Sequence, residues 1–174
     1  EIASCLVGSE MCIRDRGDVP LPGRRRHRMS TYRLKSVFAP ASIAIIGGSP
    51  RDRSAGRAVV RNLRAAGFPG RIAWINARYK RIDEVDTVPR LSDLDYVPDL
   101  VIVTTPAHTV PKVVANAAQR GVAAAIILTA GLGHGSGSLA EATERAARAH
   151  GLRLLGPHCL GVIAPHARLN ASIA

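Results

Sequence analysis

The sequence predicts an α/β fold in which a parallel sheet of about five strands carries helices on both faces. Short apolar runs alternate with segments of helical periodicity, the pattern of repeated β–α units joined by right-handed crossovers. Glycine-rich loops follow two of these runs, and a glycine closes each predicted helix. A length of 174 residues suits one ordinary domain. We expect a doubly wound, Rossmann-like sheet with the strand order 3-2-1-4-5.

Five apolar runs are interpreted as buried parallel strands, because a strand covered on both faces need not alternate in polarity. They are residues 43–46, 72–75, 100–104, 124–128 and 152–155. Residues 33–40, RLKSVFAP, are expected to be extended and to lead into the first strand. In the order 3-2-1-4-5 a ligand crevice opens at the carboxyl ends of the first and fourth strands. The loops expected to meet there are 47–56 and 130–137.

Three helices are predicted between these strands, at residues 56–66, 110–120 and 139–150. Each is followed directly by a glycine, as expected where a helix ends in a left-handed residue. Ser138 and Glu141 have the spacing of a capping box at the start of the last helix.

Positive charge is concentrated around the first glycine-rich loop. The formal net charge is +11, and residues 51–81 hold nine basic side chains against one acidic side chain, a local net charge of +8. Residues 82–174 have a net charge of −1. A solvated basic face and an anion-binding site are the two interpretations of this segment.

An anion fits the start of the helix predicted at Gly56, because the first amides of a helix are unpaired and its dipole favours negative charge. Arg51, Arg53 and Arg57 lie in or next to the loop and can supply charge-assisted hydrogen bonds. This arrangement suits a ligand with several phosphates better than a single carboxylate.

The loop does not fit an NAD site. The dinucleotide fingerprint requires Gly-x-Gly-x-x-Gly and an acidic residue at the end of the second strand. Here the glycines are Gly47, Gly48 and Gly56, and the second strand ends in an asparagine. An NADP-binding oxidoreductase stays open as an alternative, because Arg78 or Arg81 can meet a 2′-phosphate.

No catalytic or metal-binding residue is assigned. His158 and Cys159 are neighbours, so in an extended segment their side chains point in opposite directions, which favours a packed loop over a catalytic dyad. The six histidines show no metal-ligand spacing, and only His134 is a candidate for a ligand contact. No apolar run approaches the ~20 residues of a membrane span. An aromatic content of 3% disfavours a stacking platform for single-stranded nucleic acid.

Residues 1–28 are interpreted as a non-native or disordered basic tail, followed by one domain at 29–174. Residues 5–16, CLVGSEMCIRDR, resemble a translated sequencing adapter, and Met29 is a natural start. Without the tail one cysteine is left, Cys159, which predicts no disulfide framework and a reducing, cytoplasmic compartment.

Five segments carry a combined resemblance to a known family. They read FAPASIAIIGGSPRDRSAGRAVVRNL (38–63), INARYK (75–80), PDLVIVTTPA (98–107), ILTAGLGHGSG (127–137) and LRLLGPHCLGVIAP (152–165). Together they resemble the CoA-binding domain of NDP-forming acyl-CoA synthetases, relatives of the succinyl-CoA synthetase alpha subunit. The chain departs from the family pattern at Ala77, where the family usually has proline, and at His158, where it has asparagine.

The resemblance implies coenzyme A as cofactor, and with the basic loop it gives thirteen candidate binding residues. They are Gly47, Gly48, Ser49, Arg51, Arg53, Ser54, Gly56, Asn76, Arg78, Thr105, Pro106, Ala107 and Gly131.

The resemblance also implies an acid–thiol ligase that makes acyl-CoA from a carboxylic acid, CoA and ATP through an acyl phosphate and a phosphohistidine. That histidine and the ATP-grasp domain belong to further parts of the family's proteins, so we expect this chain to be a fragment that binds CoA and is inactive alone. We expect homo- or hetero-oligomers with those parts. The alternatives are a non-catalytic, CoA-dependent regulatory subunit, the N-terminal part of a protein lysine acetyltransferase fusion, and a basic nucleic-acid binder.

Overall fold

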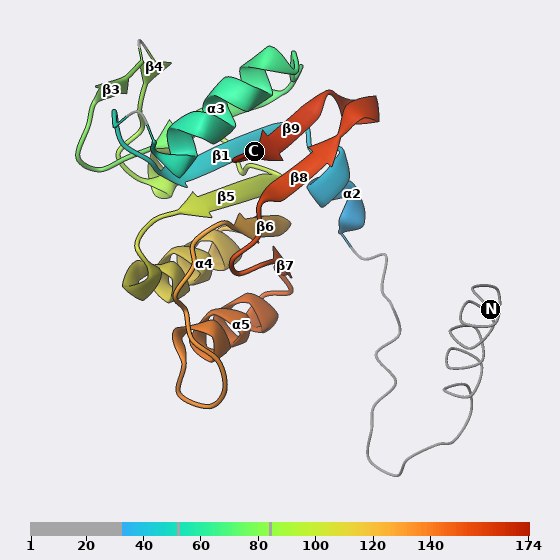
Figure 1. The fold of residues 1–174 in the computed structure, drawn as a ribbon. Coiled ribbons are helices and arrows are strands. Elements are labelled where there is room, and N and C mark those ends of the chain that lie inside the picture. Colours follow the sequence, from blue (N-terminus) through green and yellow to red (C-terminus); the bar gives the residue numbers. More distant parts are fainter. Residues whose placement is uncertain (1–32, 52, 84) are drawn as a thin grey trace, which may run out of the picture. The chain divides into compact units, whose positions relative to one another are not determined.

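The computed structural model describes residues 33–51, 53–83 and 85–174. The predicted tail, residues 1–28, lies outside them. The described part holds one five-stranded parallel sheet with helices on both faces (Figure 1), which confirms the predicted fold class. Its strands are β1 (Ser42–Gly47), β2 (Arg71–Ile75), β5 (Leu100–Thr104), β6 (Ala124–Ile127) and β7 (Arg153–Leu155).

The strand order is β2-β1-β5-β6-β7, so the predicted order is wrong: the third strand along the chain pairs with the first and not with the second. The outer edge of β2 is already used, because Val88 forms a parallel bridge with Ile75 there. At the other end of the strands the carboxylate of Asp99, just before β5, accepts hydrogen bonds from the backbone N–H groups of Ala41 (2.8 Å) and Ser42 (3.1 Å). Together these contacts place β5 beside β1.

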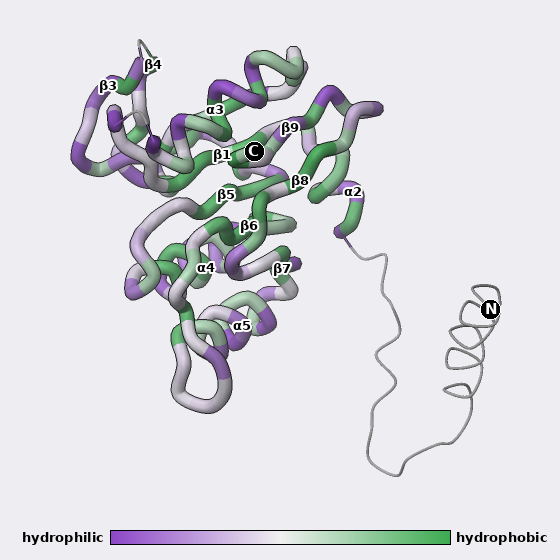
Figure 2. The backbone as a smooth tube through the Cα atoms, viewed as in Figure 1, coloured by the Kyte–Doolittle hydropathy of each residue, from purple (hydrophilic) through white to green (hydrophobic). Residues whose placement is uncertain are grey.

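Two apolar layers enclose the sheet. On one face, α3 (Ala55–Ala65), α2 (Leu34–Phe38) and a C-terminal hairpin pack on residues such as Ile43, Ile45 and Ile102. On the other face, α4 (Val110–Gln119) and α5 (Leu139–Ala149) pack on residues such as Val101 and Val103. Figure 2 shows the central strands as hydrophobic, whereas the outer side of α3 is largely hydrophilic.

The helix ends follow the local signals in the sequence. The glycines after α3, α4 and α5, which are Gly67, Gly121 and Gly151, have φ values of 68°, 87° and 65°. Ser138 caps α5 by accepting from the N–H of Glu141 at 3.1 Å. The carboxylate of Glu141 returns to the N–H of Gly137 at 2.7 Å and not to the cap residue, which completes the predicted box in a shifted form.

Three elements differ from the sequence prediction. The segment expected to be extended before the first strand contains α2, whose Val37 is buried. The segment between β2 and β5 contains a short antiparallel pair, β3 (Arg81–Ile82) and β4 (Val85–Asp86), before a 3₁₀ turn at Leu91–Asp93. The segment after β7 forms the hairpin of β8 (Gly161–Ala164) and β9 (Leu169–Ser172), which contacts α3.

Candidate functional site

The observed strand order moves the switch point of the sheet. β1 and β5 are neighbouring strands, and the helices that follow them, α3 and α4, lie on opposite faces of the sheet. The crevice therefore opens at the carboxyl ends of these two strands. A cavity of about 290 Å³ lies there, lined by Ala55, Thr104, Thr105, Pro106, Leu128 and Thr129. The loop that faces the first glycine-rich loop is therefore the one after β5, and not residues 130–137 as predicted.

Gly47, Gly48 and Gly56 allow the loop and α3 to touch. Gly47 has a φ of 102°, and a Cβ there would lie 2.8 Å from Oγ1 of Thr104. A Cβ on Gly56 would lie 2.8 Å from the Cα of Gly48. These glycines thus permit a close approach between segments of the chain itself.

Three carbonyl groups of this loop accept hydrogen bonds from side chains outside it. The indole Nε1 of Trp74 donates to the carbonyl of Gly47 at 2.7 Å, and Nδ2 of Asn76 donates to that of Gly48 at 2.8 Å. A guanidinium nitrogen of Arg57 donates to the carbonyl of Pro50 at 3.3 Å. In a planar trans peptide the N–H points away from the carbonyl, so these three contacts turn the amides of the loop away from the side chains that hold it.

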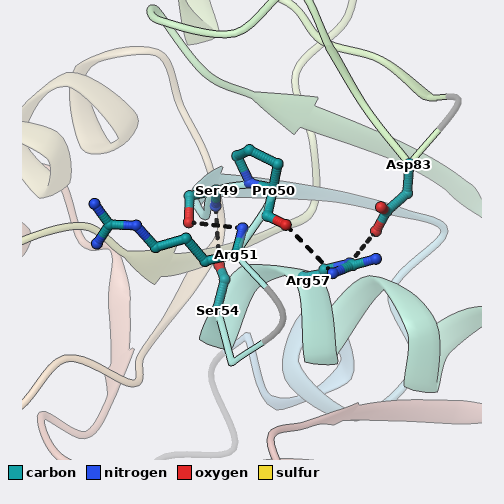
Figure 3. Close-up of polar contacts among 6 residues, drawn as sticks. All are labelled: Ser49, Pro50, Arg51, Ser54, Arg57 and Asp83. Atoms are coloured by element: carbon teal, nitrogen blue, oxygen red, sulfur yellow. Dashed lines mark hydrogen bonds and ion pairs between the residues drawn. The ribbon is translucent and has the colours of Figure 1, made fainter.

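Two serines close the loop onto the start of α3. The N–H of Ser49 donates to Oγ of Ser54 at 2.9 Å, and the N–H of Arg51 donates to Oγ of Ser49 at 3.4 Å (Figure 3). Each hydroxyl accepts in these contacts and keeps its own hydrogen for donation. Ser49 and Ser54, two of the predicted binding residues, can therefore each donate an O–H hydrogen bond to a ligand.

The N-terminus of α3 has no side-chain cap in the described structure. Ser54 occupies the cap position, but its hydroxyl accepts from the loop and not from the first turn of the helix. The helix has eleven residues, and its first amides and its dipole remain available to an anion. This agrees with the predicted anion-binding character of the loop.

The three predicted arginines of the site, Arg51, Arg53 and Arg78, are exposed. In Figure 3 the side chains of Arg51 and Arg57 extend to opposite sides of the loop. The guanidinium of Arg78 lies 5.5 Å from the ring centre of Tyr79. Not all the basic excess lies here, because Arg71 begins β2 at the opposite end of the sheet.

Asn76 has a supporting position. Besides the bond to Gly48, its side-chain oxygen accepts from the N–H groups of Arg78 (2.8 Å) and Tyr79 (3.1 Å). The side chain thus joins two loops at the crevice and orients the backbone at Arg78. We interpret it as a residue that shapes the site.

The loop after β5 brings the predicted Thr105 and Pro106 to the cavity, whereas the predicted Ala107 packs against the apolar core. Pro106 precedes a 3₁₀ turn at Ala107–Thr109 that leads into α4. Oγ1 of Thr105 is buried without a hydrogen-bond partner in the described structure. A buried hydroxyl without a partner is costly, so a polar ligand atom near the cavity would satisfy it.

Other candidates lie in the segments after β6 and β7. Gly131 and His134 lie in the exposed loop after β6, one strand further along the sheet, and no described contact joins them to the first loop. The Cys159 thiol donates to the carbonyl of Ile127 (3.4 Å), whereas His158 is exposed with a φ of 56°. Asparagine and histidine are both enriched in that left-handed conformation, which explains how histidine replaces the family's asparagine.

Sequence reasoning missed Trp74, Thr104 and Thr129. Trp74 and Asn76 are two positions apart at the end of one strand, so they point to the same face and serve successive carbonyls. A lone tryptophan in an aliphatic strand, followed by a polar residue at that spacing, was the available signal. The two threonines donate to the backbone carbonyls of Ile46 (3.1 Å) and Thr105 (2.7 Å).

Comparison with known proteins gives the same assignment as the site. Residues 41–165 match the CoA binding domain family. The chain belongs to that family. Coenzyme A is therefore the cofactor of this domain, as the family resemblance implied, and the matched residues include the whole crevice.

Two curated relatives of this CoA-binding domain are named as ADP-forming ligases. It is 35% identical over 144 residues to an acetate–CoA ligase [ADP-forming] of Methanocaldococcus jannaschii, a match that covers 82% of this chain and 20% of the relative. It is 30% identical to the alpha subunit of acetate–CoA ligase [ADP-forming] I of Pyrococcus furiosus, covering 80% of this chain and 32% of that subunit. The chain thus spans about a fifth to a third of the length of these relatives.

A solved structure with the same fold is the apo form of a dinucleotide forming acetyl-coenzyme A synthetase 1 from Ca. Korarchaeum cryptofilum. The CoA-binding domain is 31% identical to it with a TM-score of 0.74, over 80% of this chain and 31% of that one. Within the described residues no helix is long and apolar enough to cross a membrane.

Proposed function

We propose that this domain holds the phosphates of coenzyme A on the loop 47–54 and the first turn of α3, as the CoA-binding part of an ADP-forming acyl-CoA synthetase. The observation that carries the proposal is the start of α3, which has no side-chain cap. Beside it lies a loop whose carbonyls are hydrogen-bonded to other side chains and whose two serine hydroxyls can still donate. The predicted binding residues around this point remain candidates for direct contact.

The size of the binding free energy indicates that side chains take part in phosphate binding. Micromolar binding requires about 8 kcal/mol, whereas a helix dipole contributes about 0.3–2 kcal/mol. Charge-assisted hydrogen bonds contribute roughly 1.5–3 kcal/mol each, so about two to five of them account for the difference. Arg51, Arg53 and Arg78 are exposed near the loop and are our candidates for the diphosphate and the 3′-phosphate.

The remaining chemistry is assigned to other parts of the ligase. We propose that acyl-phosphate formation, the phosphohistidine and ATP binding belong to ligase and ATP-grasp domains or subunits with which this domain assembles. Its own residues bind and orient coenzyme A. A reducing cytoplasmic compartment fits the free thiol of Cys159.

Calorimetry on the full chain tests the proposal. We expect binding of CoA that weakens about tenfold on loss of the 3′-phosphate, the equivalent of roughly one charge-assisted hydrogen bond. Arg53→Glu and Arg78→Glu should each weaken CoA binding, whereas Lys35→Glu, the same charge change on α2, should not.

Different outcomes favour the alternatives. Tight NADP binding without CoA binding would support an oxidoreductase. DNA binding that falls steeply with salt would support a nucleic-acid binder. Activity of the assembled protein distinguishes a ligase from a regulatory subunit or an acetyltransferase fusion.

A further inference from the structure

We propose that Arg57 is a positioning residue, which fixes the loop 47–54 (the CoA loop) by bridging it to the turn between β3 and β4 through Asp83. The inference rests on the proposed function for its ligand. It concerns a residue that the family resemblance does not assign, and a pairing that the sequence did not predict.

The bridge joins three segments that are far apart in the sequence. Nε of Arg57, in the first turn of α3, donates to the carboxylate of Asp83, and one terminal nitrogen donates to the carbonyl of Pro50 at 3.3 Å (Figure 3). The guanidinium therefore contacts the middle of the loop and the turn after β3 at once. The side chains of Arg57 and Asp83 are 31% and 37% exposed, so solvent screens the pair only in part.

The location of Arg57 favours support over ligand contact. Its side chain lines a groove of about 510 Å³ beside α3, together with Ala58, Val60, Arg61, Arg64 and Asp83. The crevice between β1 and β5 is lined by a different set of residues. Arg57 thus holds the carbonyl of Pro50 on the groove side, and the N–H of the same peptide unit, that of Arg51, turns to the opposite side.

Arginine suits this position better than lysine. A guanidinium carries several donors in a fixed plane and can serve a carboxylate and a carbonyl simultaneously, whereas an ammonium is a single point charge. Trp74 and Asn76 hold the first half of the loop by its carbonyls, and the Arg57 bridge does the same for the second half.

The experiment compares Arg57→Ala, Asp83→Asn, the double variant and Arg61→Ala in the full chain. Asparagine tolerates the left-handed backbone of Asp83, whose φ is 46°, so Asp83→Asn removes charge without straining the turn. Arg61→Ala is the matched control, because it removes the same charge from the same groove and helix, and no loop contact is described for Arg61.

Two readouts are measured: binding of CoA and of 3′-dephospho-CoA by calorimetry, and hydrogen exchange of the amides in 47–54. We expect Arg57→Ala to weaken both ligands by the same factor, about tenfold, as for the loss of roughly one charge-assisted hydrogen bond. Asp83→Asn should weaken the binding of both ligands by a smaller factor, and the double variant should bind them as weakly as Arg57→Ala does. All three variants should show faster hydrogen exchange of the amides in 47–54. Arg61→Ala should leave the exchange unchanged.

Other results would overturn the inference. Loss of affinity for CoA but not for dephospho-CoA would make Arg57 a phosphate ligand. Tighter binding by Asp83→Asn would make Asp83 a competitor of the ligand and not a support. An unmodified chain that binds no CoA would overturn the proposed function, and the exchange measurement would still decide whether Arg57 fixes the loop.

Discussion

Gly56 is the residue at which the first turn of α3 meets the CoA loop. Its neighbours at Cβ distance are backbone atoms of Gly48 and the hydroxyl of Thr104, which cannot move aside as the end of a long side chain can. The glycine therefore sets how closely the helix N-terminus approaches the loop. An added methyl group forces a shift of one segment against the other.

We expect Gly56→Ala to weaken CoA binding at least about tenfold and to lower the free energy of unfolding by roughly 1–3 kcal/mol, the usual effect of overpacking. Calorimetry and urea unfolding measure the two effects. Ala65→Ser, at an exposed position of the same helix, is the control and should change stability by less than about 0.5 kcal/mol. Wild-type affinity in Gly56→Ala would show that the contact does not shape the site.

Single residues were predictable where their role is local. The cap at Ser138 and the glycines after the helices depend on neighbours a few positions away, and both predictions are confirmed. The roles of Trp74 and Asn76 depend on carbonyls 27 and 28 positions away, so their spacing in the strand draws attention to them but does not identify their partners. The direct ligand contacts of the predicted site residues stay predictions.

At the scale of elements, Arg120 holds the irregular connector between β4 and β5. Following α4, it donates from NH1 to the carbonyl of Ser92 (3.2 Å) and from NH2 to those of Leu94 and Tyr96 (3.2 Å for Tyr96). The connector has few backbone partners of its own, so one guanidinium replaces the hydrogen bonds that a helix would supply.

Arg120→Met keeps most of the aliphatic stem and removes these hydrogen bonds. We expect the free energy of unfolding to fall by about 1–3 kcal/mol, because three carbonyls, two of them partly buried, lose their donor. Urea unfolding measures the change, with Gln119→Ala at the neighbouring exposed position as control. Equal stability of both variants would mean that water replaces the guanidinium.

Elements were predicted well where periodicity was strong and poorly where it was absent. All five sheet strands and the three long helices lie where the apolar runs and helical segments placed them. The hairpin of β8 and β9 was missed because its first strand, Gly161–Ala164, continues a segment interpreted as a packed loop. The hairpin is buried by contact with α3, which lies far away in the sequence, so no local pattern predicts it.

For the whole molecule, the order of the strands decides where the ligand crevice lies. The sequence predicts a doubly wound sheet, but it does not show whether the third strand pairs with the first strand or with the second. Asp99 and Val88 decide this through contacts with Ser42 and Ile75. The crevice consequently lies one strand away from its predicted position, and the loop with Thr105 replaces the loop with Gly131 as the facing wall.

Asp99→Ala tests this explanation. It removes the acceptor of the N–H groups of Ala41 and Ser42, and we expect a loss of about 1.5–3 kcal/mol in the free energy of unfolding, the range for hydrogen bonds to a charged group. Asp95→Ala, in the same connector and exposed, is the control. A change below about 0.5 kcal/mol in Asp99→Ala would show that packing alone fixes the strand order.

The indole behind the loop offers a practical advantage. Trp74 is the only tryptophan of the chain, it is 1% exposed, and its Nε1–H is bonded to Gly47. Its emission therefore comes from one chromophore that is hydrogen-bonded to the loop proposed to bind the phosphates. Ligand titrations can be followed by intrinsic fluorescence without any label.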